Sequence, residues 1–108
     1  MIVVDAAAFV DALTGVSGSE QLRDRLAVEE LHAPALVDYE FVSAVRGLTL
    51  RGHLTVTRAN DTLADFEALA VHRWDAGDAL RRRAYSLRNN LSAYDAAYVA
   101  LAEALGCE

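Results

Sequence analysis

The sequence contains one cysteine, one proline and no lysine. Because Cys107 has no partner, an internal disulfide is impossible, which fits a reducing cytoplasm. No apolar run approaches the roughly 18 residues of a membrane span, so we expect no transmembrane helix. The opening segment has no basic residues and is interrupted by Asp5 and Asp11, which argues against a signal peptide. We therefore expect a cytoplasmic protein without a membrane partner.

Motifs of several common enzyme sites are also missing. No HExxH or Cys–His pairing is present, so we interpret His32, His53 and His72 as ordinary side chains. Gly15 and Gly18 do not make a phosphate-binding loop. The single cysteine has no basic neighbour that would activate it as a nucleophile. The chemistry must therefore come from other residue types.

The bulk properties are those of a folded domain. With 108 residues, 54% of them hydrophobic, the chain is long enough for one core, and we predict a single domain over 1–108. The net charge of −6 argues against a surface that attracts nucleic acid everywhere. A local basic strip beside an acidic pocket remains compatible with that charge.

Short apolar runs alternate with helical segments along the chain. We predict strands at 1–4, 34–37 and 70–74. Helices are predicted at 6–13, 20–30, 39–50, 57–69, 79–87 and 92–105. Asp38 is expected to cap the third helix, and Gly106 to end the last one. This alternation predicts an α/β fold with a mainly parallel sheet.

Three acidic residues fall where helices begin. Asp5 follows the first strand, Glu40 lies in the first turn of the helix after the second strand, and Asp95 lies in the first turn of the last helix. Parallel α/β sheets bind ligands at the carboxyl edge of their strands, so these carboxylates are expected to gather there. Mutual repulsion would favour a divalent cation, and Mg²⁺ or Mn²⁺ could then support phosphodiester hydrolysis.

Each acid also has a structural interpretation. Asp5 could be a helix N-cap, and Glu40 could favour the helix dipole. The segment from Ser92 to Asp95 fits the S-x-x-D pattern of a capping box. Spacing alone leaves a metal site and three structural acids equally plausible.

Three segments resemble VapC-type PIN-domain toxins. Residues 1–10 (MIVVDAAAFV) are similar to the opening of this family, and 34–40 (PALVDYE) to its second motif. The most specific match is 90–103 (NLSAYDAAYVALAE), which carries the third acid. The order and spacing of the motifs agree across essentially the whole chain.

The resemblance implies a three-layer PIN-like fold with a short parallel sheet, and a metal-dependent ribonuclease site. Asp5, Glu40 and Asp95 would be the catalytic acids that hold Mg²⁺ or Mn²⁺. Such proteins are toxins of type II toxin–antitoxin systems that cleave structured RNA, often tRNA or rRNA. They usually form homodimers and are neutralised by a VapB antitoxin.

The sequence departs from the family pattern in two places. Ala7 stands where the family usually has Ser or Thr, which we expect to tune activity without abolishing it. After Glu108 the family continues into a further strand and a fourth acid. Without that strand, Val3 and Val4 would lie on an open sheet edge, so either a partner covers it or the chain is truncated. The alternative function is a weakly active or inactive PIN module that binds antitoxin or dimerises.

An arginine-rich segment precedes the last motif. Arg81, Arg82, Arg83 and Arg88 could grip RNA phosphates, or could form a solvated face paired with acids, which is slightly favoured.

Two aromatic and two aliphatic residues complete the candidates. Trp74 and Tyr85 could stack on bases, although packing in the core is the favoured interpretation. Leu22 and Leu26, on the second predicted helix, are candidates for an antitoxin groove.

Overall fold

Three short strands lie side by side in the computed structural model, which describes residues 1–108. The sheet order is β1-β2-β3, and both pairings are parallel. The elements follow in the order β1 (Ile2–Val3), α1 (Ala6–Thr14), α2 (Glu20–Val28), β2 (Leu31–Pro34), α3 (Val37–Leu50), α4 (Val56–Ala68), β3 (Val71–Trp74), α5 (Asp78–Ser86) and α6 (Ala93–Leu105). No helix is long and apolar enough to cross a membrane.

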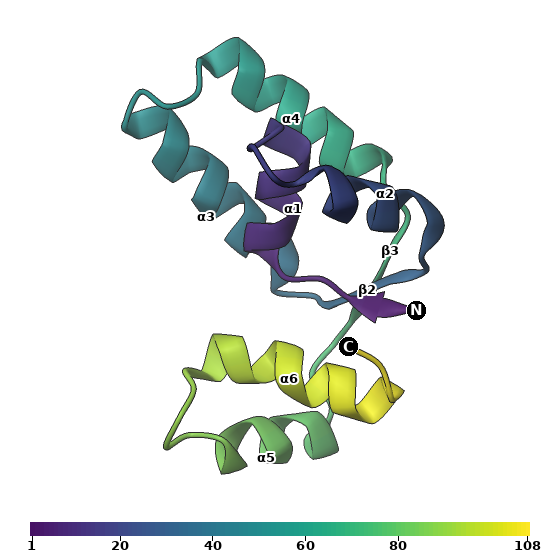
Figure 1. The fold of residues 1–108 in the computed structure, drawn as a ribbon. Helices are drawn as coiled ribbons and strands as arrows, with labels where there is room; N and C mark the ends of the chain where they lie inside the picture. The colour runs from purple at the N-terminus through teal and green to yellow at the C-terminus, as the bar shows by residue number, and fades with distance from the viewer.

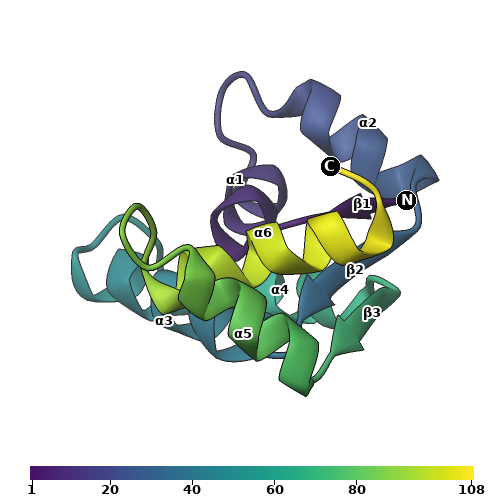
Figure 2. The same cartoon turned by 90° about the horizontal axis from the view of Figure 1, so that it is seen from below.

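The helices form two layers around this sheet. In Figure 1, α1 to α4 lie on one side of the strands, and α5 and α6 lie on the other. Seen from the α5–α6 side in Figure 2, these two helices run next to each other in front of the sheet. The arrangement confirms the predicted α/β class, with a short parallel sheet between two helical layers.

The central strand begins earlier than the sequence indicated. We predicted a strand at 34–37, but β2 spans Leu31–Pro34, and all four of its residues are buried. A middle strand that is covered on both faces buries every position, including polar ones. Because His32 is polar, the sequence pattern did not indicate that the strand begins before it, although its side chain is buried. Helix α3 then begins at Val37. Asp38 consequently lies within the helix instead of capping it, and its carboxylate binds the guanidinium of Arg73 at 2.9 Å.

Local capping sets the ends of the two helices that flank the candidate site. The carboxylate of Asp5 accepts a hydrogen bond from the amide of Ala8 at 2.8 Å, which starts α1. Ser92 starts α6 in the same way. Gly106 ends α6 with a positive φ of 69°, a left-handed conformation that favours glycine, as predicted.

Three phenylalanines hold the larger helical layer together. The Phe41 and Phe66 rings stack with centroids 4.0 Å apart, and Phe9 meets Phe66 edge to face at 5.1 Å. All three side chains are buried, and they come from α1, α3 and α4. This cluster fixes the start of α1 and of α3 relative to each other, and therefore the positions of Asp5 and Glu40.

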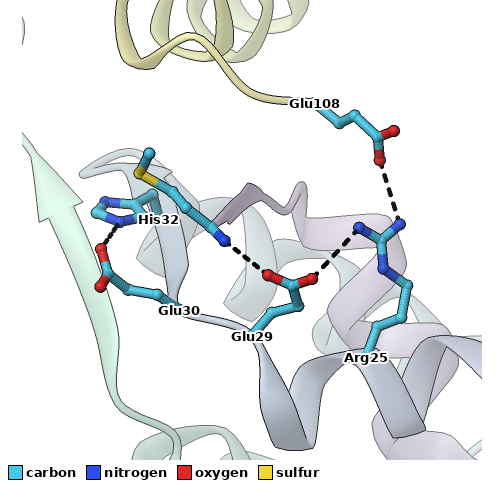
Figure 3. Close-up of polar contacts among 6 residues, drawn as sticks. Arg25, Glu29, Glu30, His32 and Glu108 are labelled. Atoms are coloured by element: carbon cyan, nitrogen blue, oxygen red, sulfur yellow. Dashed lines mark hydrogen bonds and ion pairs between the residues drawn. The ribbon is translucent and has the colours of Figure 1, made fainter.

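Strand β1 forms one edge of the sheet, as expected. Its Val3 amide donates to the carbonyl of Glu108 at 2.8 Å, so the last residue lies beside this edge. Val3 is half-buried and Val4 is buried, so the open edge exposes backbone more than apolar side chains. A chain of ion pairs reinforces the region, running from the amino group of Met1 through Glu29 and Arg25 to the Glu108 side chain (Figure 3).

Candidate functional site

Asp5 lies just after the carboxyl end of β1, where the chain leaves the sheet and enters α1. One of its carboxylate oxygens caps α1, as the structural interpretation proposed. The second oxygen has no protein partner, and the side chain is exposed. Capping therefore orients this carboxylate without using all of it.

Glu40 is held by a residue that the sequence analysis did not single out. The Tyr98 hydroxyl donates a hydrogen bond to Glu40 Oε1 at 2.5 Å, which joins α6 to the first turn of α3. Burial, this hydrogen bond and the negative charges of Glu40 and Asp5 all raise the pKa of Tyr98 well above its ordinary value. The phenol therefore remains a donor at every ordinary pH.

Asp95 lies one helical turn before Tyr98, on the same side of α6. The Ser92 hydroxyl accepts a hydrogen bond from the Asp95 amide at 3.1 Å, so Ser92, and not Asp95, caps the start of α6. The Asp95 carboxylate is exposed and forms neither a hydrogen bond nor an ion pair. The capping-box pattern thus accounts for Ser92 but leaves the acid free.

Tyr98 contacts Glu40 directly, senses the charge of Asp5, and lies one turn after Asp95 on α6. The three acids are not packed tightly, because they do not form a group whose ligand atoms all lie within 4.8 Å of one another. A hard ion such as Mg²⁺ takes oxygen ligands and usually keeps several waters, so it suits carboxylates spaced more widely than that. The free oxygens at Asp5 and Asp95 are donors of the required kind, and the residues present fit such an ion.

A second cluster lies at the opposite, amino edge of the sheet. Glu30, His32 and His72 offer ligand atoms that all lie within 4.8 Å, although the sequence had shown no metal spacing. Strand pairing brings the two histidines together, and their rings stack at 4.7 Å. Sequence spacing could not reveal this pairing, since it depends on the register of β2 against β3.

Hydrogen bonding accounts for this cluster without a metal. His32 Nδ1 accepts the indole N–H of Trp74 at 2.9 Å, so Nε2 carries the proton and donates to Glu30 at 2.6 Å (Figure 3). Ligation through Nε2 would require that proton to move to Nδ1, where the indole N–H already points. The arrangement instead lowers the pKa of Glu30 through its hydrogen bond with His32, and fixes the Trp74 side chain.

The arginines of the α5 region divide into two pairs. Arg81 forms an ion pair with Asp78, and Arg83 with Glu103 of α6. Arg82 and Arg88 form no ion pair. The favoured interpretation as a solvated face paired with acids therefore describes only half of them.

Two side chains differ from their predicted environments. We favoured core packing for Trp74 and Tyr85, but they are 41% and 68% exposed. Helix α5 buries none of its residues, because it lies outside α6 and faces solvent on most sides. The core interpretation is wrong for Tyr85, and for Trp74 it describes only the indole end that meets His32.

The two leucines of α2 are placed differently from each other. Leu26 is 7% exposed and belongs to the main core, so the fold already uses its side chain. Leu22 is half-buried and lines a shallow cavity of about 190 Å³ beside Asp5 and β1. Of the two, Leu22 is the one whose side chain is partly accessible from solvent.

Comparison with known proteins identifies the family. A model of the PIN domain matches residues 2–108. The chain belongs to the PIN domain family. Within it, the chain is 46% identical over 107 residues to VapC ribonuclease Mb0985 of Mycobacterium bovis and to Ribonuclease VapC9 of Mycobacterium tuberculosis, covering 99% of this chain and 81% of each relative. Ribonuclease VapC12 of Mycobacterium tuberculosis is 37% identical over 106 residues, which cover 98% of this chain and 81% of the relative.

These relatives place the chain among the VapC proteins and confirm the resemblance drawn from its three motifs. PIN-domain nucleases use divalent metal ions, in agreement with the oxygen donors at the carboxyl edge of the sheet.

Proposed function

We propose that the chain is a Mg²⁺- or Mn²⁺-dependent endoribonuclease that acts as the toxin of a type II toxin–antitoxin pair. Its ribonuclease class follows from membership of the VapC family. The observation that carries the proposal is the contact of Glu40 with Tyr98, whose pKa the charge of Asp5 also raises, with Asp95 one turn before Tyr98 on the same helix. Structured RNA, tRNA or rRNA, is the proposed substrate.

Each side chain has a defined part in this site. Asp5, Glu40 and Asp95 would hold the metal ion, which when bound supplies Lewis acidity and an activated water for in-line attack on phosphorus. Asp5 is oriented by its capping bond to Ala8, and Glu40 by Tyr98. Tyr98 would act through Glu40, to which it donates its hydrogen bond, and so has the role of a positioning residue. Ala7, exposed beside Asp5, adds no hydroxyl for water or substrate.

Cleavage of structured RNA by the purified chain tests the proposal. Cutting should require Mn²⁺ or Mg²⁺, stop with EDTA, and be lost in Asp5→Asn and Asp95→Asn. Asp65→Asn is the matched control, since it changes an exposed acid on α4 away from these residues and should cut normally. If the wild type binds antitoxin but does not cut with either ion, the alternative of an inactive binding module holds.

The antitoxin is proposed to be a VapB-like protein that blocks the acidic edge, and the toxin to act as a cytoplasmic homodimer. Co-expression of the neighbouring antitoxin gene should relieve toxicity. Leu22→Asp should weaken that relief, because it places a charge in the cavity beside Asp5. If the antitoxin neutralises Leu22→Asp as well as it neutralises the wild type, the antitoxin must bind at a surface that does not include Leu22.

A further inference from the structure

An apolar cavity opens at the carboxyl ends of β2 and β3, on the side where α5 and α6 lie. Its volume is about 460 Å³, within the range of small-molecule sites. Pro34 and Trp74, the last residues of their strands, form one wall, and the two helices form the other. Twelve of its sixteen lining residues are hydrophobic, so the cavity favours a ligand with an apolar face.

Three aromatic side chains line this cavity and remain open to solvent. Trp74, Tyr85 and Tyr94 are 41%, 68% and 65% exposed. The Trp74 indole is not free to turn, because its N–H is bound to buried His32, which in turn is bound to Glu30. Its orientation is therefore set before any ligand arrives, which lowers the entropic cost of stacking against it.

Positive charge lies at the same cavity. Arg88 lines it, forms no ion pair, and places its guanidinium 4.5 Å from the centre of the Tyr85 ring. Two other charged residues line it: Arg81, whose charge Asp78 compensates, and Asp75, a carboxylate that forms no ion pair. An uncompensated arginine beside an aromatic ring suits a ligand that carries both a flat ring and a phosphate.

The cavity and the acidic residues share one sheet edge and one helix. Tyr94 lines the cavity, and the next residue, Asp95, carries one of the acids. Further along α6, Ala97 lines the cavity and Tyr98 binds Glu40. A ligand in the cavity is therefore separated from the acids only by the first turns of α6.

We propose, resting on the ribonuclease function above, that this cavity binds one unstacked base of the RNA substrate. Stacking on Trp74 and Tyr85 would hold the base, and Arg88 would bind an adjoining phosphate. A second copy of the chain or an apolar protein segment would satisfy the apolar walls but would leave the charge of Arg88 unused. The cavity thus selects substrates whose bases are unpaired near the cleavage point.

The only tryptophan of the chain reports on this site directly. Trp74 emission is measured in EDTA, so that binding is observed without cleavage, during titration with adenosine 5′-monophosphate, ribose 5-phosphate and a single-stranded oligoribonucleotide. The nucleotide and the oligoribonucleotide should quench the emission, whereas ribose 5-phosphate should not. Tyr85→Ala should weaken oligoribonucleotide binding about tenfold, as expected for loss of one stacking partner. Tyr39→Ala, an exposed tyrosine outside the cavity, should bind like the wild type.

Several results would overturn the assignment. Equal quenching by ribose 5-phosphate, no quenching by any probe, or unchanged binding in Tyr85→Ala would each exclude a base at this site. A Trp74 emission that depends on protein concentration without nucleotide would assign the cavity to a second copy. If nucleotides quench Trp74 but RNA is not cleaved with Mn²⁺, the ribonuclease function is refuted and the base site is retained. If RNA is cleaved but nucleotides do not quench Trp74, the base site is refuted and the ribonuclease function is retained.

Discussion

Replacing Tyr98 with phenylalanine removes one hydroxyl and leaves the ring in place. The lost bond joins a neutral donor to the carboxylate of Glu40, a type worth about 1.5–3 kcal/mol. Tyr98 and Glu40 are only half-buried, so water can replace part of the bond, and about 1–2 kcal/mol remains. That energy corresponds to a factor of roughly 5–30. Because Glu40 is then free to leave its position, metal affinity should fall by about this factor, in line with other residues that orient metal ligands.

RNA cleavage measured against Mn²⁺ concentration checks this prediction. The half-saturating Mn²⁺ concentration of Tyr98→Phe should rise roughly 5- to 30-fold, with the cleavage rate largely restored at saturating metal. Tyr39→Phe removes the same atom from an exposed tyrosine next to Glu40 and should behave like the wild type. If Tyr98→Phe kept the wild-type metal dependence, other contacts would have to position Glu40, and the role assigned to Tyr98 would be wrong.

Three further changes test other parts of the structure. Arg88→Gln should lower the slope of log affinity against log salt by about one in RNA-binding titrations, whereas Arg58→Gln on α4 should leave it unchanged. Phe66→Ala should cost about 3–5 kcal/mol of unfolding free energy in urea, because it empties the centre of the three-ring cluster; a cost near zero would contradict that packing. The ion pair with Arg83 lowers the pKa of Glu103, so its stabilising effect is present above the ordinary carboxylate pKa of 4.5 and is lost as the pH falls below it. Thermal unfolding at several pH values should show this acid loss reduced in Glu103→Gln.

The sequence predicted the fold wherever local chemistry sets an element. Asp5, Ser92 and Gly106 mark helix ends through their own side chains or backbone, and each was read correctly. The start of β2 was missed because burial of His32 depends on its partners, Trp74 and Glu30, which lie outside the strand's own pattern. Register between strands is a tertiary property, and it also brought His32 and His72 together unexpectedly.

The sequence nominated the three acids of the candidate site, whose role stays a prediction, but not the residue that supports Glu40. Asp5 and Glu40 follow from the rule that helices after parallel strands begin at one edge, whereas Asp95 lies on a helix that follows another helix. Tyr98 carried a signal, since it lies three residues after Asp95 and therefore on the same side of the helix. Its contact with Glu40 joins residues 58 positions apart, which no local pattern encodes.

Helix α5 buries none of its residues and is attached mainly through α6. It can therefore open locally at small free-energy cost, while the core between the sheet and the other helical layer stays closed. Amide hydrogens of α5 should exchange with solvent long before those of α3. This independence also matters for evolution. Substitutions in α5 can change one wall of the cavity beside the acids without destabilising the phenylalanine cluster. If the cavity binds RNA as proposed, a VapC protein built this way can acquire a new RNA preference while the proposed metal-binding acids keep their positions.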